Sequence, residues 1–167
     1  MSAKSKQSNV KKTTLKTAKP KRTKIICVSH QEDADGISSA ALIKQAFGGD
    51  TILVDYPGIM DVLESLRNDE KLKKLFICDL GLNTQTNDSF VALLTELRKK
   101  RISVTYVDHH EIDSKVATKL KKIKVKLIHD ISECTSVLIY DAFKKKLTEH
   151  SPFIAACGAI TDYMENK

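Results

Sequence analysis

Short apolar runs alternate with longer amphipathic stretches from residue 25 onward, a pattern typical of βαβ units. The apolar runs predict strands at residues 24–29, 51–55, 74–78, 103–107 and 125–128. The amphipathic stretches predict helices at residues 37–47, 59–68, 88–100, 135–145 and 152–162. Strands that alternate with helices pair in parallel, so the pattern predicts an α/β fold with a Rossmann-like, mostly parallel sheet and helices on both faces.

The first 24 residues do not follow this pattern. They hold nine Lys or Arg residues, no acidic residue and few apolar ones, so they cannot bury enough apolar surface to offset the entropy of ordering. We therefore predict a disordered basic arm over residues 1–24 and one domain over residues 25–167. The net charge of +7 comes from the arm, because the rest of the chain has 19 basic and 21 acidic residues. The arm suits either an electrostatic tether to phosphate or acidic partners, or a solubilising tail.

The cysteines and the hydropathy of the chain indicate a cellular compartment. The four cysteines are single, without a CxxC pair, which is typical of reduced thiols rather than of a disulfide framework. The chain has no apolar run of about 18 residues and no apolar stretch near its start. We therefore expect a cytoplasmic protein that neither spans a membrane nor is secreted.

Acidic residues and histidines follow three of the predicted strands. The first strand is followed by His30, Asp33 and Asp35, the third by Asp79, and the fourth by Asp108, His109 and His110. Because the carboxyl ends of parallel strands meet at one edge of a sheet, we expect these side chains to converge. Carboxylates held so close repel one another in a partly desolvated cleft unless cations neutralise them.

The types of residue in this cluster favour particular cations. Carboxylate oxygens with a few imidazoles suit Mn²⁺ or Mg²⁺, and the lack of thiolate pairs argues against structural zinc. Two such ions about 3.5–4 Å apart would clamp a phosphoryl group and activate a water molecule. That spacing needs a shared carboxylate, and Asp79, on a central strand, is the candidate.

Each residue also has a structural interpretation. Asp33 or Asp35 could cap the helix that follows, His30 could be an ordinary hydrogen-bonded histidine, and Asp79 could belong to a turn. Thr135 and Ser136 are better interpreted as a capping segment than as nucleophiles. The conjunction of acids and histidines at several strand ends, rather than any single residue, favours a metal site.

Four segments resemble, in order, the motifs of the DHH phosphoesterases. They are VSHQEDADGISSAAL at residues 28–42, FICDLGLN around Asp79, YVDHHEID around Asp108, and GAITDY around Asp162. The resemblance implies two divalent cations, preferably Mn²⁺, otherwise Mg²⁺. It implies that one ion is held by His30, Asp33 and Asp79, and the other by Asp35, Asp79, His109 and Asp162.

The same resemblance implies roles in catalysis and substrate binding. His110 would face the substrate phosphate, and Asp108 would orient a neighbouring imidazole. Gly36 suits a place where the backbone comes close to the phosphate. The spacing from His30 to Asp33 departs from the pattern of some branches of the family, which leaves Glu32 as a possible substitute for His30.

The resemblance also bears on domain organisation and substrate. Members of the family usually continue into a smaller substrate-binding domain, whereas five residues follow Asp162, so we expect that domain to be absent here. The sequence is then a fragment, a naturally truncated protein, or a subunit whose other half comes from a partner chain. The leading hypothesis is a metal-dependent phosphodiesterase similar to RecJ-type single-strand exonucleases and oligonucleotide-degrading enzymes. The substrate would be single-stranded nucleic acid or a nucleotide. The alternatives are a member acting on a cyclic dinucleotide or pyrophosphate, and a non-catalytic scaffold subunit of a nucleic-acid-processing assembly.

Overall fold

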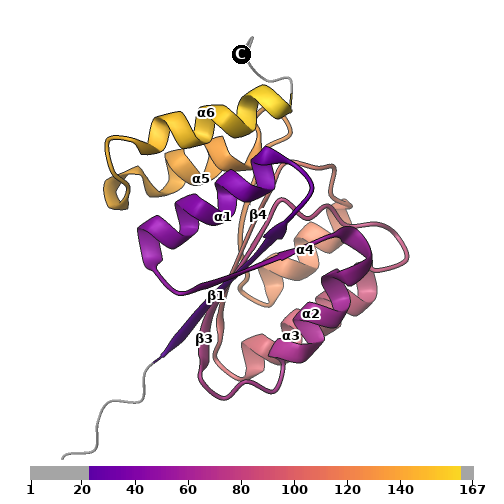
Figure 1. Ribbon diagram of the computed structural model, residues 1–167. Coiled ribbons are helices and arrows are strands. Elements are labelled where there is room, and N and C mark those ends of the chain that lie inside the picture. The colour runs from indigo at the N-terminus through magenta and orange to yellow at the C-terminus, as the bar shows by residue number, and fades with distance from the viewer. Residues whose placement is uncertain (1–22, 163–167) are drawn as a thin grey trace, which may run out of the picture.

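A single parallel sheet organises the computed structural model, which describes residues 23–162 (Figure 1). Its strand order is β2-β1-β3-β4-β5, and every adjacent pair is parallel. The strands are β1 (Lys24–His30), β2 (Asp50–Val54), β3 (Leu72–Cys78), β4 (Ser103–Asp108) and β5 (Lys126–His129). Since β2 lies on one side of β1 and the later strands lie on the other, the order reverses between β1 and β3. Ligands of open α/β sheets bind at such a point, beyond the carboxyl ends of the strands.

Helices cover both faces of the sheet, as the sequence predicts (Figure 1). One face is covered by α1 (Ala34–Phe47), α5 (Thr135–Phe143) and α6 (Ser151–Thr161), which pack on one another. The other face is covered by α2 (Ile59–Leu66), α3 (Asn87–Lys99) and α4 (Ser114–Lys122). Two short 3₁₀ turns complete the chain, η1 (Tyr56–Gly58) and η2 (Lys144–Lys146). None of the helices across residues 23–162 has the length and apolar composition needed to cross a membrane.

The central strands are apolar on both sides because helices bury both faces of the sheet. In β3, Leu75 and Ile77 join the cluster beneath α2, α3 and α4, whereas Phe76 and Cys78 join the cluster beneath α1, α5 and α6. This explains why β3 appears in the sequence as a continuous apolar run rather than as an alternating one. Two packed layers of helices hold the strand ends in fixed positions.

The main differences from the predicted elements concern α4, the start of α1 and residue 24, and other element ends shift by one or two residues. Helix α4 was not predicted, because its sequence is rich in lysine and it buries only Val116 and Leu120. Helix α1 begins at Ala34 rather than at residue 37, because the Asp33 side chain caps it by accepting a hydrogen bond from the Gly36 N–H at 2.8 Å. Most of the predicted basic arm, residues 1–22, lies outside the described residues, and Lys24 is the first residue of β1 rather than part of an arm.

Candidate metal centre

Asp79 lies at the carboxyl end of β3, beside the point where the strand order reverses. Its backbone has a φ of 56°, in the left-handed region that few residues other than glycine adopt. The Asp79 N–H donates to the Val107 carbonyl at 3.0 Å, which fixes this turn to the neighbouring strand β4. The side chain is only 1% exposed. A strained backbone that buries a carboxylate indicates a functional position.

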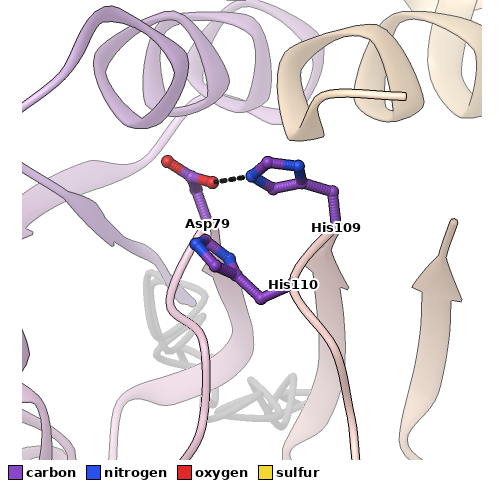
Figure 2. Close-up of side chains that lie close together, drawn as sticks. All are labelled: Asp79, His109 and His110. Atoms are coloured by element: carbon purple, nitrogen blue, oxygen red, sulfur yellow. Dashed lines mark ion pairs between the residues drawn. The ribbon is translucent and has the colours of Figure 1, made fainter. Parts of the chain in front are cut away.

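Asp79 faces two clusters of candidate ligands. One contains His30, Asp33 and Asp79, the other Asp79, His109 and His110, and the ligand atoms of each lie within 4.8 Å of one another. Figure 2 shows Asp79 pointing toward His109, with Asp79 Oδ1 3.5 Å from His109 Nε2. The other oxygen, Oδ2, lies 3.9 Å from His30 Nδ1. The two oxygens of one carboxylate thus face separate clusters, as a bridging ligand requires.

Three buried ligand atoms at this place lack a hydrogen-bond partner among residues 23–162. They are His30 Nε2, Asp79 Oδ2 and Asp162 Oδ2, and Ser39 Oγ is the only other such side-chain atom in that range. Asp162 comes from the end of α6, where its Oδ2 lies 3.4 Å from His109 Nε2. Leaving a buried polar atom unsatisfied costs about 1–3 kcal/mol. Divalent cations would satisfy the two carboxylate oxygens, whereas His30 Nε2 faces Asp55 Oδ1 at 3.8 Å. Oxygen and imidazole ligands suit Mn²⁺ or Mg²⁺.

We call His30, Asp33, Asp79, His109 and Asp162 together the candidate metal centre. The carboxylates of this centre have too few positively charged neighbours to neutralise them. Burial, followed by the charges of nearby carboxylates, raises the pKa of Asp79 from its ordinary 3.8 to about 9 and that of Asp162 to about 6. In the part of the chain that the structure describes, the ion pairs of Asp33, Asp79 and Asp162 involve only histidines. Without a cation, the centre therefore holds protons that it would release on binding one.

His109 and His110 are shifted in opposite directions. Burial, followed by repulsion from His110, lowers the pKa of His109, which favours the neutral imidazole that a metal ligand must be. The hydrogen bond to Asp108 raises the pKa of His110, which favours the charged imidazolium that an anion attracts. Neighbouring groups with opposite shifts can take different chemical roles.

Asp108 fixes the orientation of His110. Its Oδ1 accepts a hydrogen bond from His110 Nδ1 at 2.8 Å, and its Oδ2 accepts one from the Tyr106 hydroxyl at 2.8 Å. Gly81 makes room for the imidazole, because a Cβ atom there would lie 2.8 Å from His110 Cγ. The structure thus brings Asp108 against His110, and their predicted part in catalysis stays a prediction.

Asp35 belongs to neither of the two clusters around Asp79, although one of its oxygens lies within 4.8 Å of a ligand atom of Asp162. It is fully buried, and its two oxygens accept the backbone N–H groups of Thr135 at 2.7 Å and Ser136 at 2.8 Å, at the start of α5. It groups with Cys134 and Asp162 rather than with Asp79. A carboxylate at a helix N-terminus is stabilised by the exposed N–H groups and the helix dipole. The structure therefore gives Asp35 a structural role, and its assignment to the second ion stays a prediction.

Gly36 also has a structural explanation. A Cβ atom there would collide with the His30 backbone, and the Gly36 N–H already donates to Asp33 Oδ1. Glycine is thus required by the close packing of α1 on the end of β1. Its predicted contact with a substrate phosphate stays a prediction.

The sequence analysis missed several neighbours of the centre. Thr135 Oγ1 donates to Asp79 Oδ1 at 3.0 Å, Asp55 Oδ1 lies 3.8 Å from His30 Nε2, and the Tyr56 hydroxyl lies 3.2 Å from His110 Nε2. Glu32, the suggested substitute for His30, groups with His30 and Asp55. Asp55 and Tyr56 directly follow β2, so the strand-end rule would have found them had it been applied there. No local pattern identifies Thr135, because its contact depends on how α5 packs.

Comparison with known proteins identifies the family. A model of the DHH family, N-terminal domain, matches residues 24–161. The chain belongs to the DHH family. This is a family of phosphoesterases, and the match ends one residue before Asp162. The family membership that the four sequence motifs predicted is thus confirmed.

A solved structure supports the DHH fold. An uncharacterized protein from Helicobacter pylori G27 aligns with a TM-score of 0.59 and 19% identity, over 79% of this chain and 40% of that one. At this identity the likeness shows the fold alone. The aligned part of this chain covers 40% of the length of that protein. Comparison with curated proteins gave no match.

Proposed function

We propose that this DHH domain is a divalent-cation-dependent phosphodiesterase that cleaves single-stranded nucleic acid or short oligonucleotides, as RecJ-like enzymes do. One observation carries the proposal: the two oxygens of the buried Asp79 face separate clusters of nitrogen and oxygen ligands. Cleavage of phosphodiesters by two cations requires such a shared carboxylate between them.

The residues divide between two positions. His30, Asp33 and Asp79 would hold one ion, and Asp79, His109 and Asp162 would hold the other, with Asp35 behind them at the start of α5. Mn²⁺ or Mg²⁺ bound there would polarise the phosphate and lower the pKa of the attacking water. The unpartnered atoms Asp79 Oδ2 and Asp162 Oδ2 support this division, because each belongs to a proposed ligand.

His110 is the proposed phosphate contact. Its Nδ1 is held by Asp108, so Nε2 faces away from Asp108, beside the Tyr56 hydroxyl, and the raised pKa keeps the ring positively charged over more of the neutral range. A charged imidazole stabilises the negative charge that develops on the phosphate oxygens as water attacks. The nine basic residues among the first 24 support a nucleic-acid substrate, because lysine-rich segments bind phosphate backbones without regard to sequence.

A second candidate function is that of a scaffold subunit. Helix α6 carries no charged residue over Ser151–Thr161, and it exposes Phe153 at 75% and Ile160 at 60%. Large exposed apolar side chains on an uncharged helix are typical of surfaces that bind other proteins. A partner chain bound there could supply a substrate-binding domain. A scaffold role is therefore compatible with catalysis, provided that the metal centre is active.

Calorimetric titration with Mn²⁺, combined with an assay of 5′-labelled single-stranded DNA, tests the proposal. We expect about two ions per chain and cleavage that requires Mn²⁺ or Mg²⁺. Asp79→Ala should abolish both, whereas the matched surface variant Glu149→Gln, in which the substituted side chain is exposed, should change neither. Two bound ions without cleavage of any phosphodiester would favour the scaffold, and the absence of ion binding would refute the metal centre.

A further inference from the structure

Tyr56 is an exposed aromatic residue beside the acidic candidate metal centre. It opens the 3₁₀ turn η1 directly after β2, at the same edge of the sheet as the centre. Its N–H donates to Asp55 Oδ1 at 2.6 Å, which fixes the start of the turn. The residue is nevertheless 42% exposed. An aromatic side chain held by a fixed turn and left open to solvent is available to a ligand.

The contacts of Tyr56 connect both clusters of the centre. Its ring lies with its centroid 4.7 Å from that of His30, and 6.3 Å from that of His110 in an edge-on arrangement. Its hydroxyl lies 3.2 Å from His110 Nε2, the atom that the proposed function assigns to the phosphate. When His110 Nε2 carries a proton, the Tyr56 hydroxyl accepts a hydrogen bond from it, so the O–H of Tyr56 stays free to donate to an anion that reaches His110.

We propose that Tyr56 is a substrate-binding residue, whose hydroxyl donates to the phosphate that His110 contacts and whose exposed ring stacks on a nucleobase beside that phosphate. This inference rests on the proposed function and narrows the substrate to phosphodiesters that carry a base. A base stacks on an aromatic ring whatever its identity, because every base has a π face. Inorganic pyrophosphate has no group that would use the ring.

The shape of the surface around Tyr56 favours stacking over insertion. A small cavity of about 30 Å³ opens beside the ring, lined by Ile59, Met60, Leu82 and others. This volume has room for about one water molecule and not for a base. A base must therefore lie across the exposed ring, which also suits cleavage without sequence preference.

Two variants separate the hydroxyl from the ring. Tyr56→Phe keeps the ring, and Tyr56→Ala removes both groups. The substrates are a single-stranded oligonucleotide and the same backbone with abasic sites flanking the cleaved bond. We expect Tyr56→Ala to lower kcat/KM on the normal substrate roughly 5- to 150-fold beyond any loss on the abasic one, the range measured for one stacked base. Tyr56→Phe should raise KM on both substrates equally and preserve the preference for bases.

The controls distinguish a binding role from a structural one. Glu149→Gln changes an exposed side chain away from the centre and should leave both substrates unaffected. Mn²⁺ binding should persist in both Tyr56 variants, because Tyr56 is not a proposed ligand. Equal losses on the normal and abasic substrates in Tyr56→Ala would overturn the inference, since ring stacking would then contribute nothing.

A second measurement does not depend on turnover. An oligonucleotide containing 2-aminopurine reports stacking through quenching of its fluorescence, and it can be added to the metal-free chain. Quenching by the wild-type chain and by Tyr56→Phe, lost in Tyr56→Ala, would support the inference even if cleavage failed. Absence of quenching by the wild-type chain would overturn it, whether or not the chain proves to be a metal-dependent phosphodiesterase.

Discussion

Replacing Asp79 with asparagine is expected to stabilise the metal-free chain while abolishing its response to cations. The folded chain raises the pKa of this carboxyl from 3.8 to about 9 by burial and by repulsion from neighbouring acids. The folded state therefore holds a proton that the unfolded state releases above pH 3.8. Retaining it up to pH 7 costs the folded chain about 4 kcal/mol, at about 1.4 kcal/mol per pH unit.

Asparagine would remove this cost at little expense in packing. It has nearly the same shape, its amide oxygen can still accept from the Thr135 hydroxyl, and it tolerates the left-handed backbone at φ 56°. Since about 1 kcal/mol shifts the melting temperature of a domain of this size by 2–4 °C, Asp79→Asn should raise Tm in EDTA at pH 7 by up to about 8–16 °C. The gain should be small near pH 4, where the carboxyl of the unfolded wild type is only partly ionised, and should grow as pH rises toward 9.

Thermal melts of wild type and Asp79→Asn, in EDTA and in excess Mn²⁺ from pH 4 to 9, measure these effects. Mn²⁺ should raise the Tm of the wild type, because a cation that binds only the folded chain stabilises it, and should leave the variant unchanged. Glu149→Gln, an exposed carboxylate neutralised in the same manner, should match the wild type throughout. A variant that melts below the wild type in EDTA at pH 7, or a gap that does not depend on pH, would refute the argument.

Three other substitutions test the surroundings of the centre. Thr135→Val removes the hydroxyl that donates to Asp79 and should weaken Mn²⁺ binding about 10- to 100-fold in calorimetry, with the fold retained in circular dichroism. Asp108→Asn removes the largest cause of the raised pKa of His110, so an NMR titration of the His110 ring should show a lower midpoint than in the wild type; an unchanged midpoint would contradict the assigned contact. Gly158→Ala would place a Cβ atom 2.5 Å from Asp35 Oδ1, and urea denaturation should show a loss of about 1–3 kcal/mol, whereas a neutral result would mean that α6 packs less tightly.

The family resemblance and the strand-end pattern both depend on short stretches of sequence, and together they predict the residues of the candidate metal centre. His30 and Asp33 lie three positions apart at the end of one strand, and Asp79 and His109 each follow an apolar run whose strand is recognisable within a few residues. The rule that parallel strands bring their carboxyl ends to one edge then predicted that these side chains converge. The structure brings them together, with Asp79 between the two clusters.

Tertiary packing determines which side chains contact one another around the candidate metal centre. Asp35 and the start of α5 are about 100 positions apart, and Thr135 reaches Asp79 across 56, so neither contact leaves a trace in a local pattern. Tyr56 meets His110 because β2 and β4 lie on opposite sides of β1 and β3 in the sheet and their loops turn toward the same place. Periodicity fixes which side of a helix or strand is buried, since a few neighbouring residues encode it. The strand order and the packing of the helices depend on many weak apolar contacts between segments that are distant in the sequence. These contacts form together only in the folded chain, so no short stretch of sequence predicts them.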